Sequence, residues 1–141
     1  MTATLLRHAI WMDRGVSIEP SSVPAIDMIA ITQLAESDEQ GDEFIAEIIE
    51  VFLADLSKRV QSIGLQTSQG DRVGIAATAH SIKGSCGHFG AARLMELSRE
   101  VEDRAKRQQT DGLQTAIDSM IAETERVRAA LEAYRADDAR G

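Results

Sequence analysis

The stretch DRVGIAATAHSIKGSCGHFGA, residues 71–91, decides how this chain folds. On a helical wheel of about 100° per residue, His80 lies well away from the apolar arc, and Lys83 follows on the same side one turn later. The apolar arc consists of Ile75, Ala79, Ile82, Cys86 and Phe89. The other residues on the side of His80 are small: Val73, Ala76, Ala77, Gly84 and Gly87. The sequence therefore predicts a helix from about Asp71 to Gly87 that buries one face and exposes a histidine on the other.

The small residues around His80 predict that its imidazole is open to a protein partner. A glycine inside a helix costs roughly 1 kcal/mol relative to alanine, and the segment contains two, Gly84 and Gly87. An exposed neutral imidazole can attack phosphorus, and Lys83 at i+3 can pair with phosphate oxygens. The charges of this region give a local balance of +2, from Arg72, Lys83 and Arg93 against Asp71. The metal and the carboxylate that phosphoryl transfer also needs would come from a partner.

Helical patterns flank this segment on both sides. Apolar residues recur at spacings of three and four from Glu43 to about Gln66, which indicates a long helix buried on more than one side. A short helical stretch from Ile26 to near Ser37 precedes it, and residues 38–42 form a polar break. Turn residues 67–71 follow the long helix, with Asp71 or Ser68 as a candidate N-cap.

Two more helices follow the histidine segment. One begins near Ala91 and presents Leu94, Leu97, Val101 and Ala105. The last has a heptad seam, which we interpret as intramolecular core more readily than as a dimer zipper. The seam consists of Leu113, Ile117, Met120, Val127, Leu131 and Tyr134. We predict an all-α protein: an up-and-down bundle of four main helices with a short extra N-terminal helix, over residues 27–135, followed by a frayed tail at 136–141.

Composition narrows the possible functions. The 141 residues have a formal net charge of −8, which argues against nucleic acid as a partner. Cys86 is the single cysteine, so an internal disulfide is impossible. No apolar run approaches the roughly 18 residues of a membrane span, so we expect a cytoplasmic protein with no membrane contact. Residues 1–26 have the composition of an arm or linker, ordered in part or not at all.

The stretch from His80 to Ala91 resembles the signature of histidine-containing phosphotransfer (HPt) domains, roughly H-x-[LI]-K-G-[SA]-[SA]-x-x-[LIVMF]-G-A. Cys86 is a mild departure, because a second small polar residue is usual at its position. The preceding helix is similar at Phe52, Leu53 and Leu56, and Leu94 follows at the familiar distance. The resemblance covers about residues 27–135. The matching signature residues are His80, Ile82, Lys83, Gly84, Ser85, Phe89, Gly90 and Ala91.

The resemblance implies a phosphorelay intermediate. His80 would accept a phosphoryl group, through Nε2, from an aspartate of one receiver domain and pass it to the aspartate of another. By position, Lys83 would neutralise the phosphate, Gly84 would give clearance, Ser85 would make a local hydrogen bond, and Gly90 would form the turn into the next helix. The implied partners are receiver domains of response regulators or hybrid histidine kinases. The chain itself would need no cofactor, with Mg²⁺ supplied by the receiver, and would act as a monomer.

Other functions are weighed against this one. Without a Walker-type loop, no phosphorylation from ATP is expected. The alternative function is that of a docking module, which would modulate a receiver or histidine kinase without accepting phosphate. A metal-binding bundle is disfavoured, because none of the three histidines follows a glutamate at i−3. We interpret His88 as a helix-end residue and Cys86 as a small core residue. The initiator methionine favours a free-standing protein over a segment of a hybrid kinase.

Overall fold

The computed structural model describes residues 24–36, 41–108 and 111–140, and every regular element in these ranges is a helix. The elements are α2 (Met28–Glu36), α3 (Gly41–Gln69), α4 (Arg72–Ser85), the 3₁₀ turn η2 (Cys86–Phe89), α5 (Ala92–Lys106) and α6 (Leu113–Arg140). The predicted arm lies outside the described residues up to position 23. Ala25 and Ile26, which were assigned to its end, are buried in the hydrophobic core. The core therefore begins before α2.

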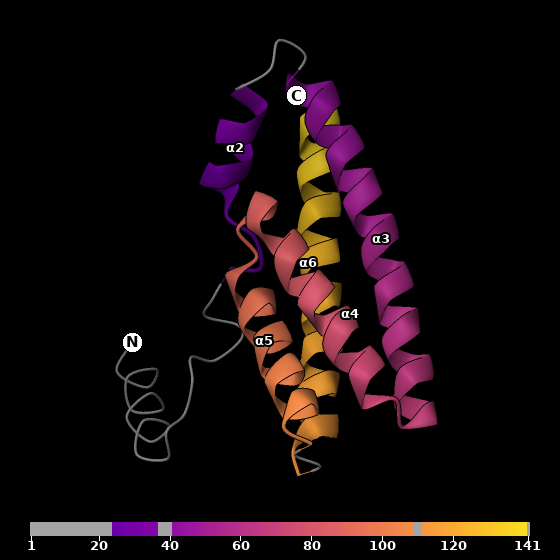
Figure 1. Cartoon of the computed structure of the whole chain (residues 1–141). Coiled ribbons are helices and arrows are strands. Elements are labelled where there is room, and N and C mark those ends of the chain that lie inside the picture. The colour runs from indigo at the N-terminus through magenta and orange to yellow at the C-terminus, as the bar shows by residue number, and fades with distance from the viewer. Residues whose placement is uncertain (1–23, 37–40, 109–110, 141) are drawn as a thin grey trace, which may run out of the picture.

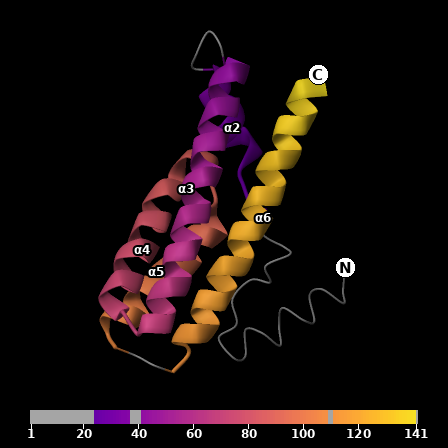
Figure 2. The same cartoon turned by 90° about the vertical axis from the view of Figure 1, so that its right-hand side faces the viewer.

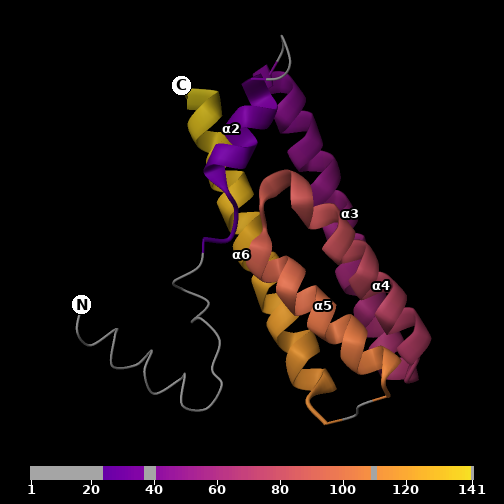
Figure 3. The same ribbon diagram turned by 60° about the vertical axis from the view of Figure 1, so that its left-hand side comes forward.

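Helices α3 to α6 form the four-helix bundle, and each runs antiparallel to the one before it (Figure 1). The predicted all-α bundle with a short additional helix is confirmed. At 1.5 Å per residue, α3 and α6 are about 43 Å long and α4 and α5 about 22 Å. The long helices therefore extend beyond the short ones at one end, where α2 lies beside α3 (Figures 1 and 2). The pair α4 and α5 lies on one side of the bundle (Figure 3).

The core is built from the predicted stripes. On α3 the buried residues include Ile45, Ile49, Leu56 and Ile63, and the whole predicted arc of α4 and η2 is buried. The seam of α6 is buried from Leu113 to Leu131, and Tyr134 packs against it while half-buried. The seam is thus part of the core of a single chain. Aliphatic side chains do most of this packing because aromatic residues are scarce.

Four helix boundaries differ from the prediction. The third helix was expected to reach Gly87, but α4 ends at Ser85 and the chain tightens into η2, where the Cys86 amide donates to the Lys83 carbonyl. Helix α3 starts at Gly41, inside the predicted polar break. It ends at Gln69, so the first three residues of the predicted turn 67–71 are helical and the turn itself is shorter. Helix α6 continues to Arg140, past the expected start of the tail at residue 136, because no glycine or proline interrupts the sequence before Gly141.

The turn after η2 holds α2 in place. Gly90 has φ 59°, and a Cβ there would lie 2.3 Å from the Asp27 Cβ, so two features of the backbone exclude other residues. The Asp27 amide donates to the Phe89 carbonyl at 2.8 Å. The Asp27 carboxylate accepts from the amides of Ile29 and Ala30 and caps α2. The short helix is thereby fixed to the end of the segment that contains His80.

Candidate functional site

His80 lies on the outer side of α4, and its side chain is 64% exposed. Helix α4 begins with a capped first turn: the Asp71 carboxylate accepts from the Gly74 amide at 2.9 Å, as predicted for one of the two N-cap candidates. Val73 and Ala77 are exposed on the same side. Ala76 is buried, although the wheel placed it with the exposed residues; it lies on the side of α4 that meets α5, in one hollow with Glu102 and Ala105.

The imidazole is held by a residue from the neighbouring helix, Glu102 of α5. The His80 Nδ1 lies 3.0 Å from Glu102 Oε2. The same carboxylate pairs with two lysines: Lys83 Nζ is 3.1 Å from Oε1, and Lys106 Nζ is 2.7 Å from Oε2. The Glu102 side chain is only 5% exposed. The buried Glu102 carboxylate therefore has three partners: His80 and Lys83 from α4, and Lys106 from its own helix, α5.

The charge of Glu102 is stable across the physiological pH range. Burial by itself would raise the pKa of this carboxyl group, but hydrogen bonds from Lys106, Lys83 and His80 outweigh it and lower the pKa to about 2. Glu102 is therefore ionised, and an ionised carboxylate only accepts hydrogen bonds. It follows that the His80 Nδ1 donates its proton to Glu102.

This hydrogen bond selects the tautomer of His80. A neutral imidazole has one N–H donor and one nitrogen with a free lone pair. With the proton on Nδ1, the lone pair belongs to Nε2, and the largely exposed ring makes that nitrogen available to a partner. The arrangement is that of a nucleophile oriented by a carboxylate.

The other predicted site residues, Lys83, Gly84 and Ser85, are the last three residues of α4. Lys83 is half-buried and paired to Glu102. A Cβ at Gly84 or at Gly87 would meet nothing within 4 Å, so neither glycine is required by packing inside the chain. The Ser85 hydroxyl donates to the Ile82 carbonyl at 2.9 Å and does not contact His80. His88 lies in η2, exposed, as expected of a helix-end residue.

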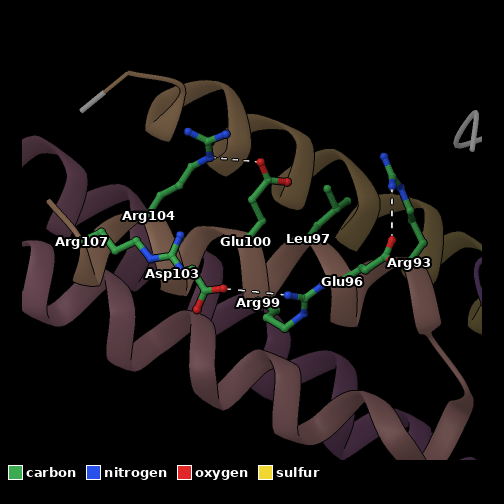
Figure 4. A pocket seen from close by; sticks show the side chains of 8 residues that line it. All are labelled: Arg93, Glu96, Leu97, Arg99, Glu100, Asp103, Arg104 and Arg107. Carbon is green, nitrogen blue, oxygen red and sulfur yellow. Dashed lines mark hydrogen bonds and ion pairs between the residues drawn. The ribbon is translucent and has the colours of Figure 1, made fainter. Parts of the chain in front are cut away.

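A hollow lies beside His80 between α4 and α5. It is lined by Arg72, Val73, Ala76, Ala77, His80, Ser81, Glu102, Ala105, Lys106 and Gln108. Both Arg72 and Arg93 were counted in the predicted positive charge around His80. Arg72 lines this hollow, but Arg93 does not. The Arg93 side chain is mostly buried and lines a second hollow, formed by residues of α5 and Arg107, where it pairs with Glu96 at 3.7 Å (Figure 4). The positive charge nearest to His80 therefore comes from Lys83 and Lys106, and Arg93 was wrongly included.

Sequence reasoning missed Glu102 and Lys106. Their i,i+4 spacing is that of a helical ion pair, and Glu102 adjoins the buried stripe of α5 between Val101 and Ala105. An acidic residue at the edge of a buried stripe was the available signal. It did not indicate His80 as the partner, because 22 residues separate the two in sequence.

Comparison with known proteins agrees with this geometry. Residues 47–137 match the Hpt domain family, and the chain belongs to that family. A solved structure, histidine-containing phosphotransfer protein B (HptB) from Pseudomonas aeruginosa PAO1, is similar with a TM-score of 0.74 and 26% identity. The alignment covers 82% of this chain and 97% of HptB. No curated protein sequence matched. Family and structure together support a phosphotransfer role in two-component signalling.

Among residues 24–36, 41–108 and 111–140, no helix is both long and apolar enough to cross a membrane. Within the same part of the chain, no group of three or more histidine, cysteine or acidic residues could hold a metal ion.

Proposed function

We propose that this protein is a phosphorelay intermediate: His80 accepts a phosphoryl group from the aspartyl phosphate of one receiver domain and passes it to the aspartate of another. The observation on which this rests is the 3.0 Å contact between His80 Nδ1 and Glu102, which leaves Nε2 of an exposed ring as the nucleophile.

The transfer follows from the tautomer. The lone pair of Nε2 forms the N–P bond while the O–P bond of the aspartyl phosphate breaks, and the bonding electrons return to the aspartate carboxylate. The phosphorylated ring, with its proton still on Nδ1, gains positive charge, which the anionic Glu102 stabilises. In the second transfer the N–P bond breaks toward the next aspartate, and the ring becomes neutral again.

Lys83 has the position of a phosphate-binding cation. Its ammonium is one helical turn from His80 and is held by Glu102 at 3.1 Å. We infer that this contact keeps the lysine oriented in the free protein, and that the ammonium pairs with phosphoryl oxygens when the ring is phosphorylated. We expect the Mg²⁺ for the reaction to be held by the receiver, as its acidic pocket provides oxygen ligands.

The face around His80 suits a docked protein. The open space over Gly84 and Gly87 lets a partner backbone approach the ring. On one side of His80, Val73 is 83% exposed at the hollow between α4 and α5. On the other side lies a mainly apolar hollow lined by Phe44, Glu47, Ile48, Val51, Phe52, Asp55, Ser85, His88 and Phe89. We infer that a receiver contacts both hollows, with its aspartyl phosphate above His80, and that a monomer of this chain meets it in the cytoplasm.

The test is transfer of a labelled phosphoryl group. The protein is incubated with a ³²P-phosphorylated receiver domain, and the label on this chain is followed for acid lability and base stability. We expect label on the wild type and none on His80→Gln, with both proteins folded by circular dichroism. His8→Gln, the same change at a histidine outside the signature stretch, is the matched control and should be labelled normally. Equal labelling of His80→Gln would refute the assignment.

A further inference from the structure

Lys106 has the shortest contact in the His80 cluster but lies outside the signature stretch. Its Nζ lies 2.7 Å from Glu102 Oε2, the oxygen that also accepts the His80 Nδ1 proton. Lys83 pairs with the other oxygen, Oε1. Lys106 and His80 therefore share one acceptor atom, whereas Lys83 does not compete with the ring for it.

We propose that Lys106 is a positioning residue that acts through Glu102: by sharing Oε2 it limits the negative charge that the imidazole meets, and so keeps the ring neutral and nucleophilic to a lower pH. This role rests on the proposed function of His80 as phosphoacceptor. A protonated ring has no lone pair on Nε2 and cannot attack phosphorus. Glu102 alone favours that protonated form, and Lys106 opposes it.

The charges that face His80 come from two helices. From α4 they are Lys83 and Arg72, and from α5 they are Glu102 and Lys106. The hydrogen bond with Glu102 raises the pKa of Lys106, so this ammonium stays charged while a histidine titrates. Lys106 and His80 each lie within 3.0 Å of Oε2.

The size of the effect of Lys106 on His80 follows from the distance between the two groups and from their exposure to solvent. The ammonium and Nδ1 are within about 6 Å of each other, where Coulomb interaction in a medium close to water shifts a titration by roughly half to one pH unit. The Lys106 side chain is 63% exposed, which excludes the larger values of a dry site. Salt will reduce the shift further, because mobile ions screen exposed charges.

The decisive measurement is an NMR titration of the ring in the full-length, unphosphorylated protein. The His80 Cε1–H signal is assigned by its loss in His80→Gln. In Lys106→Met we expect its titration midpoint to rise by roughly half to one pH unit at low salt. Lys106→Arg should restore most of the wild-type midpoint. Lys58→Met, the same change at an exposed lysine of α3, is the matched control. A Lys106→Met midpoint equal to that of Lys58→Met, or lower than that of the wild type, would overturn the proposal.

A second readout connects the titration to the reaction. The rate of phosphoryl transfer from a phosphorylated receiver is measured between pH 5.5 and 9, a span of about 3.5 units chosen to bracket histidine titration. In Lys106→Met the pH of half-maximal rate should rise with the titration midpoint, and in Lys106→Arg it should stay near that of the wild type. Lys106 also lines the hollow that a receiver is inferred to contact, so its loss can lower the rate at every pH alike, and each pH profile is therefore scaled to its own maximum. A scaled profile of Lys106→Met with the same midpoint as the wild type would overturn the proposal. Labelling of His80→Gln would refute the proposed function alone, since the titration tests the coupling without any phosphotransfer.

Discussion

Replacing Glu102 with glutamine tests whether a buried carboxylate holds the site together. At about 1.4 kcal/mol per pH unit, lowering the pKa of Glu102 from 4.5 to about 2 corresponds to roughly 3 kcal/mol of folding free energy at neutral pH. His80 and Lys106 are largely exposed, so solvent screening reduces that figure. We expect Glu102→Gln to lower the free energy of unfolding by about 1–2 kcal/mol at pH 7.

The contribution of Glu102 to the free energy of unfolding should decrease as the pH falls. The pKa of Glu102 is lower in the folded than in the unfolded chain, so the stabilisation is complete above about pH 4.5 and is lost as the pH falls through about 2. Urea unfolding of the wild type and the variant should therefore show a difference that shrinks by roughly half between pH 7 and pH 3. The matched control is Glu96→Gln, an exposed acid on the same helix, which should change stability by less than about 0.5 kcal/mol.

The same variant should also slow the reaction. A glutamine carbonyl can still accept from Nδ1, but the negative charge that stabilises the phosphorylated ring is lost, so we expect transfer to slow by about tenfold to a hundredfold. The assay is single-turnover transfer from a phosphorylated receiver. A difference in stability that does not change with pH, together with an unchanged transfer rate, would refute the role given to Glu102.

Three further outcomes follow from the structure. Gly84→Leu should fold normally, because a Cβ there meets nothing within 4 Å, yet it should slow transfer to His80 at least about tenfold in the labelling assay by blocking the partner. Gly90→Ala should lower the urea midpoint by the equivalent of about 1–3 kcal/mol, because φ is 59° and a Cβ would collide with Asp27; an unchanged midpoint would contradict this. Burial raises the pKa of Cys86 to about 12, so the native protein should resist iodoacetamide at pH 8, measured by mass spectrometry, and react only when unfolded.

Much of the fold is readable from the sequence because helix formation here is local. The spacing of apolar residues on α3 and α6 follows the helical repeat, so their existence, buried faces and order could be predicted without knowing what covers them. Boundaries were less predictable. Helix α4 ends at Ser85, where the chain tightens into η2, and the Phe89 carbonyl at the end of η2 accepts from the Asp27 amide, far away in the sequence.

The candidate site, like the fold, could be predicted only where it depends on a single helix. His80, Lys83 and Gly84 lie within five consecutive residues of one helix, and helical geometry alone places the histidine and lysine on one side. Arg93 shows the limit of such reasoning: closeness in sequence led us to count it in the local charge balance around His80, but it lines a different hollow.

The sequence by itself indicated the candidate phosphoacceptor, His80, and the surface that exposes it, since both depend on a single helix. Only the tertiary structure provides a physical reason for the proposed reaction at Nε2, which the resemblance had implied. Packing of α4 against α5 brings Glu102 to Nδ1 across 22 residues of sequence, and its fixed charge gives Nε2 the free lone pair. A hydrogen bond between two helices depends on their separation and rotation, which the periodicity of either helix does not contain.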